Sequence, residues 1–441
     1  MIPVLRFSNT DDAARIDAIV ARLRLDPREM ALSRGHRAEM TRTVQNILEQ
    51  VADRGDAALV DIARKFDDPD FRPEQLRVTP AKMADAAERL DKNLLAALRR
   101  SIAQVREYQT HVMPKKPGTL KRGGLEMDMR FTPLDSAGIY FPGGKAAYPS
   151  SLIMLAVPAL VAGVGRIVVC TPGSKFGKSD IVLAAAHEVG ITEMYRVGGA
   201  AAIGALAFGT ESIAAVDKIV GPGNSYVQIA KKLVAGCVGI DGYLGPSEIL
   251  TLADDSANPA FIAADLIAQA EHDPGSCFLL TTSETLASRV LDEIAAQLRF
   301  AERVEPITRA LRDDSMIVVD PSMDRLVELA NRIACEHVNL QTQDDQAMLA
   351  RLRHVGAVYV GQWSPVAAGD YVAGPSHCLP TNTTARFSSG ISVYEFLKRS
   401  SVMSYDAASI AADAPAIIAL AGAEHLDAHA SSAKIRVTSS E

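Results

Sequence analysis

Two series of strand-like segments that alternate with helix-like segments constrain the fold of this chain more than any other feature. The strand-like runs of the first series are rich in β-branched residues and lie at 166–172, 194–199 and 218–224. Those of the second series lie at 248–254, 277–283, 316–320 and 357–363. Such alternation is typical of parallel sheets that carry helices on both faces. The sequence therefore predicts an α/β fold with two doubly wound, incomplete Rossmann-like domains.

Helical patterns precede and follow these two series. The apolar residues of an early window recur on one face of a helix, and they are Val44, Ile47, Leu48 and Val51. This spacing is that of an amphipathic helix packed on a core. The tail from about Gly390 becomes helical again and ends in a strand-like run at 433–437. We therefore expect helical N-terminal and C-terminal extensions around the α/β domains.

The composition indicates a soluble protein of the cytoplasm. A hydrophobic content of 48% over 441 residues is enough for a sizeable core and for more than one domain. The balance of 46 Lys+Arg against 53 Asp+Glu is acidic, which argues against nucleic acid or a membrane as a partner. The first residues carry no secretory pattern, and the longest apolar run, 152–164, is too short to span a bilayer. Five separated cysteines without CxxC spacing indicate reduced thiols.

Two glycine-rich segments contain backbone that a ligand can approach closely. The segment 138–151 lacks the spacing of a phosphate-binding P-loop, but it contains Tyr140 and precedes a helix expected to begin near Pro149 or Ser150. The segment 220–228 combines glycines with the amide of Asn224. Each segment taken by itself is better explained as a structural turn than as a ligand site.

Several polar residues have the donor atoms of a metal site. Gln269 and His272 are three residues apart at the end of a helix, and Asp370 follows a strand in a loop. His429 lies on a helical segment near the C-terminus, close to Glu424. An amide, a carboxylate and two imidazoles without sulfur suit Zn²⁺, Mn²⁺ or Co²⁺. The alternatives are a histidine on a helix dipole and an aspartate in a turn.

The dipeptide Glu336-His337 is flanked by apolar residues on both sides. Neighbouring residues after a helix can both point into one cleft, which suits a pair of groups that share proton transfer. A solvated surface dipeptide is the alternative. Spacing by itself therefore supports only a general hypothesis of a metalloenzyme.

Nine motifs occur in the order known from one protein family. They are YFPGGKAAYPSS, VGGAAAIGALAFGTES, DKIVGPGNSYV, GPSEIL, DLIAQAEHD, EHVNLQT, GDYVAGPSHCLPT, ARFSSGISV and AEHLDAHA. Each motif is modest, but nine in order are very specific, and they extend from about Ala137 to His429. On these motifs the chain resembles the histidinol dehydrogenase family.

The resemblance implies an NAD-dependent homodimer with one Zn²⁺ per subunit. Such an enzyme oxidises L-histidinol through the aldehyde to L-histidine, reduces two NAD⁺ and completes histidine biosynthesis. The implied zinc ligands are Gln269, His272, Asp370 and His429. The implied catalytic bases are Glu336 and His337. The implied NAD contacts are Tyr140, Asn224 and the position of Ala201.

The resemblance also implies how substrate and subunits are arranged. The substrate pocket would be lined by Ser247, His337, Glu424 and the zinc ligands. Glu424 and His429 would reach across the dimer into the partner's site. The expected parts are an N-terminal helical arm (1–31), a larger discontinuous α/β domain with the zinc and substrate site (32–137 and 246–390), an inserted α/β domain on the NAD side (138–245) and a C-terminal helical segment that crosses the dimer (391–441).

The chain departs from the family pattern at a few positions. Ala201 stands where the family usually has a glutamine that contacts NAD, the residues at 242–244 differ from the usual sequence before Ser247, and Cys335 precedes the catalytic pair. His377, in the same segment as Asp370, is a weaker candidate ligand, and no role is assigned to His425. These departures have two explanations, drift within the lineage or a second hypothesis for the function, a related zinc- and NAD-dependent dehydrogenase of another polar alcohol such as a sulfopropanediol. A third hypothesis, from another class, is a non-catalytic zinc-binding dimer.

Overall fold

The structure is a computed structural model that describes residues 2–35, 37–144, 146–272 and 274–438. The chain forms two compact units. The first, here called the main unit, comprises Met1–Val112 and Asp135–Phe396. The second, here called the C-terminal unit, comprises Met113–Leu134 and Leu397–Glu441. The two units are described separately below.

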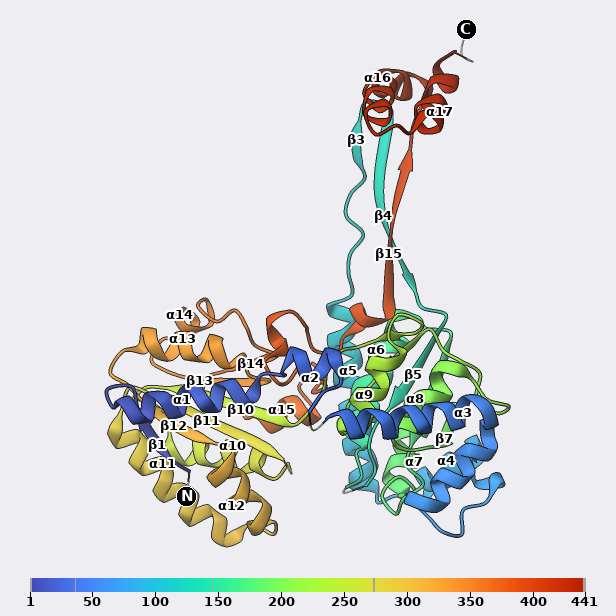
Figure 1. Ribbon diagram of the computed structural model, residues 1–441. Coiled ribbons are helices and arrows are strands. Elements are labelled where there is room, and N and C mark those ends of the chain that lie inside the picture. The colour runs from blue at the N-terminus through green and yellow to red at the C-terminus, as the bar shows by residue number, and fades with distance from the viewer. Residues whose placement is uncertain (1, 36, 145, 273, 439–441) are drawn as a thin grey trace. The chain divides into compact units, whose positions relative to one another are not determined.

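The first sheet of the main unit has the strand order β1-β12-β11-β10-β13-β14, and its neighbouring strands are parallel (Figure 1). Its strands are β1 (Val4–Arg6), β10 (Ser247–Ala253), β11 (Gly275–Thr281), β12 (Met316–Val319), β13 (His337–Gln341) and β14 (Ala357–Val360). The order reverses between β10 and β13, which is the arrangement of a doubly wound sheet. The predicted α/β fold is confirmed in this part of the chain.

Side chains of the first sheet alternate between two hydrophobic cores, as the period of two in a strand requires. Ile249 and Cys277 belong to one core, with helices α10 (Pro259–Ala270), α11 (Glu284–Gln297) and α12 (Val304–Asp313). Leu250 and Phe278 belong to the other, with α1 (Thr10–Leu23), α13 (Met323–Ile333) and α14 (Asp345–Leu349). Complete burial of one such apolar side chain contributes about 1.5–3 kcal/mol. These strands therefore read as nearly continuous apolar runs, because both of their faces are covered.

The second sheet of the main unit repeats this topology with the order β2-β7-β6-β5-β8-β9, in which only the pair β2 and β7 is antiparallel among the described strands. Its strands are β2 (Arg77–Val78), β5 (Ser136–Tyr140), β6 (Arg166–Thr171), β7 (Glu193–Arg196), β8 (Lys218–Val220) and β9 (Gly239–Ile240). Its helices are α3 (Arg37–Phe66), α4 (Pro80–Arg89), α5 (Lys92–His111), α6 (Pro149–Ala162), α7 (Asp180–Val189), α8 (Gly199–Phe208) and α9 (Ser225–Val234). The predicted start of α6 at Pro149 is confirmed.

Packing in the main unit differs from the expected domain boundaries. The apolar face of α3 packs into the hydrophobic core of the second sheet. This core contains Val44, Leu48 and Val51 of α3 together with Tyr140 of β5 and Ile203 of α8. Helices α4 and α5 also pack on α7 and α6 of that layer. Residues 37–111 therefore belong with the inserted segment, and the expected N-terminal arm contributes β1 to the first sheet. The apolar face of α3 was read correctly from the sequence, but its period does not say which sheet it covers.

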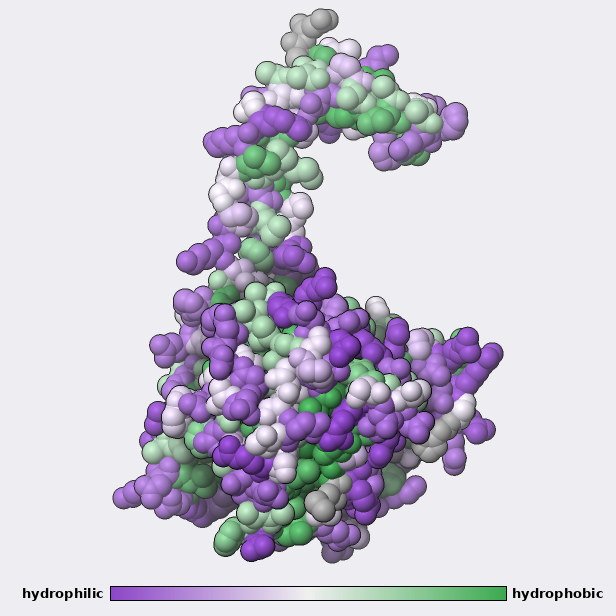
Figure 2. Space-filling view, turned by 90° about the vertical axis from the view of Figure 1, so that its left-hand side faces the viewer, coloured by the Kyte–Doolittle hydropathy of each residue, from purple (hydrophilic) through white to green (hydrophobic). Residues whose placement is uncertain are grey.

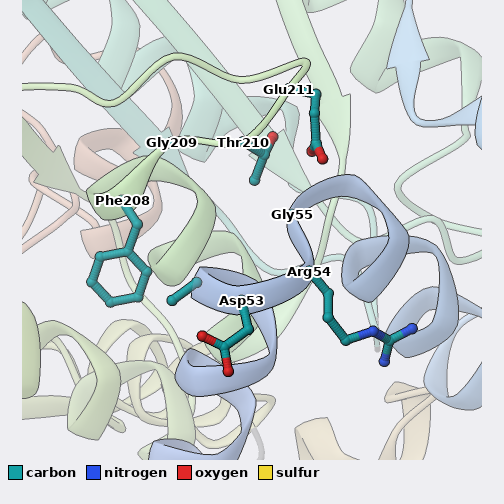
Figure 3. A pocket seen from close by; sticks show the side chains of 8 residues that line it. Asp53, Arg54, Gly55, Phe208, Gly209, Thr210 and Glu211 are labelled. Atoms are coloured by element: carbon teal, nitrogen blue, oxygen red, sulfur yellow. The ribbon is translucent and has the colours of Figure 1, made fainter.

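Helix α3 changes direction at Gly55, which has φ +50° and ψ −130°. Glycine is favoured at this position because a residue with a Cβ rarely adopts this backbone conformation. The backbone amide of Asp56 donates to the carboxylate of Glu211 at 2.7 Å. The carboxylate of Asp56 accepts from the hydroxyl of Thr210 at 2.6 Å. Figure 3 shows the loop after α8 facing this break across a small open pocket. These contacts set the direction of the second half of α3.

The C-terminal unit combines an antiparallel sheet of order β15-β4-β3 with two packed helices. Its elements are β3 (Leu120–Arg122), β4 (Leu125–Pro133), β15 (Leu397–Ser404), α16 (Ala407–Ala423) and α17 (Asp427–Thr438). The expected strand-like end at 433–437 is wrong, because these residues lie in α17, where Asp427 in the first turn and Arg436 in the last turn favour a helix. The expected helical segment 391–441 also includes β15. Of the helices that the structure describes, none is long and apolar enough to cross a membrane.

Candidate functional site

A cavity of about 940 Å³ in the main unit collects most of the predicted site residues. Its volume lies at the upper end of the range for ligand pockets. Loops from both sheets line it, together with the end of α3. The predicted site residues that line it are Tyr140, Ala201, Asn224, Ser247, His272, Glu336, His337 and Asp370.

The second sheet presents the carboxyl ends of its strands to the cavity, where doubly wound sheets bind ligands. Tyr140 ends β5, and its hydroxyl accepts a hydrogen bond from the Gly199 amide at 3.2 Å. Burial raises the pKa of Tyr140 to about 12, so the phenol keeps its proton. Asn224 follows β8 and caps α9 by accepting from the amides of Tyr226 and Val227 at 3.1 and 3.2 Å. The side-chain NH₂ of Asn224 remains available to a ligand.

The first sheet presents the opposite ends of its strands to the same cavity. Ser247 begins β10, His337 begins β13, and His272 precedes β11. The expectation that Asp370 lies in a loop at the carboxyl ends is wrong. Asp370 belongs to the short helix α15 (Val366–Tyr371) and lies against His337. The carboxyl edge of one sheet and the amino edge of the other therefore line one cavity.

The side chain of His337 is buried and held at one ring nitrogen. Its Nδ1 lies 3.0 Å from the carbonyl oxygen of Glu248 and 3.3 Å from a carboxylate oxygen of Glu336. Its Nε2 lies 3.7 Å from Asp370 Oδ1 and has no hydrogen-bond partner among the described residues. A proton on Nδ1, donated to the carbonyl, would leave Nε2 to receive a second proton.

Charge around His337 controls its affinity for that proton. Burial by itself lowers the pKa of His337, but the carboxylates of Glu336 and Asp370 outweigh burial and raise the pKa to about 10. Glu336 is itself fixed, because its Oε2 accepts the amide of Glu248 at 2.8 Å. The three groups form an acid–base cluster at one end of the cavity.

Glu248 is a buried acid that the sequence argument missed. Only 2% of its surface is exposed, its Oε1 accepts the amide of Asn382 at 2.9 Å, and its Oε2 has no partner in the described part of the chain. Burial raises the pKa of Glu248 to about 8. A carboxylate in the otherwise apolar strand 247–253 was the available signal, since buried acids need a special environment. The backbone of Glu248 positions both members of the predicted catalytic pair: its amide donates to the carboxylate of Glu336, and its carbonyl oxygen contacts Nδ1 of His337.

The raised pKa of Glu248 predicts how stability depends on pH. The folded state binds a proton more tightly than the unfolded state, whose carboxyl has the ordinary pKa of 4.5, so stability falls as the pH rises from about 5 to about 8. Replacing Glu248 by Gln removes this titration. We expect the free energy of unfolding to change by about 3 kcal/mol less between these pH values than in the wild type. Urea denaturation at pH 5 and pH 8 measures the difference.

The control for this measurement is Glu74→Gln, which removes an exposed carboxyl of the same type. Its pH dependence should match that of the wild type. If the free energy of unfolding changes by the same amount between pH 5 and pH 8 in the wild type and in Glu248→Gln, the prediction is contradicted.

The predicted metal ligands are divided between the two units. Gln269 lies in the last turn of α10, is buried, and its Nε2 has no partner among the described residues. His272 follows α10 and is exposed to solvent, although the protein atoms crowded around it lower its pKa. Burial would raise the pKa of Asp370, but the neighbouring ring of His337 and the positive charges of His337, His377 and His272 outweigh burial and lower the pKa.

The fourth predicted ligand, His429, is exposed in α17 of the C-terminal unit. Glu424 is the C-cap of α16 in the same unit and is also exposed. Within a single copy, the described residues contain no group of three or more His, Cys, Asp or Glu side chains placed to hold a metal ion. The metal ligands therefore remain a prediction.

His377 was a weaker candidate ligand, and the structure gives it a different contact. Its Nδ1 lies 2.8 Å from the carbonyl oxygen of Asp370, and its Nε2 lies 3.1 Å from the hydroxyl of Ser151 at the start of α6. His377 thus joins α15, which carries Asp370, to the layer of the second sheet. Cys335 is buried beside Glu336, and burial raises the pKa of its thiol.

Comparison with known proteins identifies the family. The family model described as histidinol dehydrogenase matches residues 31–437. The chain is 46% identical to the histidinol dehydrogenase of a Synechococcus strain over 89% of this chain and 91% of the relative, and 42% identical to that of Gluconobacter oxydans over 96% and 99%. The crystal structure of histidinol dehydrogenase from Elizabethkingia anophelis is similar with a TM-score of 0.91 and 31% identity, covering 99% of this chain and 98% of that one. This chain therefore belongs to the histidinol dehydrogenase family of oxidoreductases.

Proposed function

We propose that the protein oxidises L-histidinol to L-histidine through the aldehyde, reducing two NAD⁺ in a zinc-dependent homodimer. The observation that carries this proposal is the cluster of Glu336, His337 and Asp370 in the same cavity as the glycine-rich ends of β5 and β8. Relatives named histidinol dehydrogenase, matched over most of their length, support the choice of substrate. As a biosynthetic enzyme with free cysteines, the protein would act in the cytoplasm.

In the first oxidation, His337 accepts the hydroxyl proton of histidinol at Nε2. A hydride leaves the same carbon for the nicotinamide ring, so the alcohol becomes an aldehyde and one NADH forms. In the second oxidation, Glu336 takes a proton from water as its oxygen attacks the aldehyde carbon. The hydrated aldehyde would then lose a hydride to a second NAD⁺ and its remaining hydroxyl proton to solvent, which leaves the carboxylate. Both hydrides leave one carbon, so the aldehyde must stay in the cavity between the steps.

The residues present fit a zinc ion. Gln269 offers a buried amide, whose oxygen can coordinate a cation, His272 an accessible imidazole, and Asp370 a carboxylate in the cavity. Amide, imidazole and carboxylate donors suit Zn²⁺. We propose that these three, with His429 of a second copy, hold the ion. When bound, it would anchor the imidazole and amine of histidinol and offset the charge of Asp370, which raises the pKa of His337.

The surface of the C-terminal unit supports a dimer. Helix α16, which the structure describes in full, is rich in alanine and isoleucine, yet only Ala414 and Ala421 are buried in it. Leu420 is 67% exposed and Leu426 41% exposed, and Figure 2 shows apolar surface over these C-terminal helices. A helix that is apolar all round is normally buried, so a second copy is expected to cover it. That contact would bring Glu424 and His429 to the partner's cavity.

A specific feature also favours a second candidate, the oxidation of another polar alcohol such as a sulfopropanediol by the same groups. Ala201 and Tyr243, which lie at positions where the chain departs from the family pattern, both line the cavity. The substrate and cofactor surfaces of this chain are therefore altered at these two positions.

The test is to count NADH formed per L-histidinol consumed, before chelation, after chelation and after zinc is restored. We expect two NADH per histidinol, loss of turnover with the chelator and recovery with zinc, because the site needs both the bases and the ion. One NADH per substrate would contradict the two-step oxidation. Turnover that is indifferent to chelation would contradict the zinc site. Metal-replete protein that oxidises a sulfopropanediol but not histidinol would favour the second candidate, and metal content without turnover of either alcohol would favour a non-catalytic dimer.

A further inference from the structure

The cavity extends past the acid–base cluster to an end formed by α3. The residues that line this end come from both halves of the helix and from the position after it, and they are Thr43, Ile47, Ile62, Phe66 and Asp67. The break at Gly55 turns the second half of α3, so that the helix contributes to this wall from either side of the break. None of these residues was predicted from the sequence to belong to the cofactor site, because α3 was expected to belong to the other domain.

We propose that this end binds the adenosine of the dinucleotide and that Asp67 selects NAD over NADP by receiving the ribose hydroxyls and repelling a 2′-phosphate. This inference rests on the proposed use of a nicotinamide dinucleotide. It concerns only the adenosine half of that cofactor, whereas hydride transfer concerns the nicotinamide half.

Orientation in the cavity follows from where the reaction must occur. The nicotinamide has to meet the carbon that His337 serves, so it occupies the end with Ser247 and His337. The glycine-rich backbone at 143–144, 198–199 and 223 lines the same cavity with little side-chain bulk, as a pyrophosphate requires. The adenosine then extends toward α3. Ile47 and Ile62 pack against the hydrophobic core under the second sheet, and they offer a flat apolar ring the contact it needs.

Asp67 has the contacts of a carboxylate that still has room for a ligand. Its carboxylate accepts the amide of Gly173, in the loop after β6, at 3.3 Å, and this carboxylate makes no other hydrogen bond within the described chain. A carboxylate near the carboxyl edge of a nucleotide-binding sheet can accept the hydroxyls of the adenosine ribose. The negative charge of this carboxylate repels a phosphate esterified at the 2′-hydroxyl of that ribose.

Among the residues that the structure describes, neither the lysine paired beside Asp67 nor the arginine that lines the cavity provides an alternative site for a 2′-phosphate at the α3 end. Lys178 is the nearby lysine, and its ammonium is paired with Asp68. Among the described residues, Arg303 is the only arginine or lysine that lines the cavity, and it precedes α12, which packs with the first sheet. NADP-binding sites place an arginine at the 2′-phosphate. The α3 end offers a carboxylate instead.

The experiment measures binding of ADP-ribose and of 2′-phospho-ADP-ribose to the full-length protein by calorimetry, because neither probe contains nicotinamide or needs turnover. We expect the wild type to bind ADP-ribose at least about tenfold more tightly than its 2′-phosphate. Asp67→Asn keeps an acceptor for the Gly173 amide but removes the charge, and it should reduce this ratio to within about threefold.

Two further variants make the result specific. Asp70→Asn removes the same charge from an exposed residue in the same loop that does not line the cavity, and it should retain the wild-type ratio. Ile47→Ala should weaken both probes by a similar factor and leave their ratio unchanged, because it removes only apolar contact. A wild type that does not discriminate, or an Asp67→Asn protein that discriminates as the wild type does, would overturn the inference.

Failure of the proposed function would look different. A protein that discriminates between the probes through Asp67 but does not oxidise histidinol supports the adenosine site and contradicts the proposed substrate. A protein that oxidises histidinol with NADP⁺ and NAD⁺ equally supports the substrate and overturns the inference.

Discussion

Replacing His337 by Asn is expected to lower kcat for histidinol oxidation by about three orders of magnitude while metal content stays near that of the wild type. His337 is the buried group that lines the cavity and whose Nε2 has no hydrogen-bond partner among the described residues, so the variant loses the acceptor for the alcohol proton. Loss of such a general base costs about 10²–10⁴ in rate. Asparagine keeps a side-chain donor for the carbonyl of Glu248, which now holds Nδ1 at 3.0 Å. Steady-state kinetics and metal analysis of the same preparation check both parts of the prediction.

The matched control for this variant is His429→Asn, which should lose metal and turnover together. If His429 serves the cavity of the partner, an equal mixture of the two variants, dissociated and reassembled, should recover part of the activity. Mixed dimers then contain one cavity with both histidines. Metal loss in His337→Asn, or a mixture that stays as inactive as its components, would contradict the assignment of these two histidines.

The second large effect is expected for Glu336→Gln, which should lower the rate of the second oxidation by about 100-fold or more. The amide can still accept the Glu248 hydrogen bond that Glu336 accepts at 2.8 Å, but it cannot take a proton from water. The variant should therefore accumulate aldehyde and form close to one NADH per histidinol. Trapping the aldehyde with a carbonyl reagent and counting NADH in a single turnover measures this change.

The control for Glu336→Gln is Glu271→Gln, because Glu271 also precedes a histidine but is the exposed C-cap of α10. It should form two NADH per histidinol at nearly the wild-type rate. Two NADH from Glu336→Gln at an undiminished rate would show that another group activates the water. Glu248 would be the first alternative, since it lies beside Glu336.

The strand and helix series could be predicted from the sequence because the signals are local. Runs such as 248–254 and 277–283 are apolar on both faces, and the doubly wound order of both sheets was expected from their alternation with helices. Where local signals were weak, the expectation failed. The run 433–437 alternates like a strand but lies in α17, because its two β-branched residues, Ile435 and Val437, are too few to outweigh the helix around them.

The pairing of Glu336 with His337 could also be predicted from the sequence, since the two residues are adjacent. The environment that gives them their chemistry was not. Glu248 is about 90 residues away along the chain, yet its backbone contacts both groups at 2.8 and 3.0 Å. The register between β10 and β13 produces these contacts, and register follows from the packing of the complete sheet.

The sequence by itself determined the fold class, the family and the types of side chain that the chemistry needs, because periodicity, motif order and residue identity are properties of short segments. Only the tertiary structure decided which edges of the two sheets share a cavity, that α3 forms one end of it, and that Glu248 and Asp67 lie where they do. Those facts depend on which apolar faces pack together over long sequence separations. Many alternative pairings of such faces satisfy the same local pattern, and only the packing of the whole main unit selects among them.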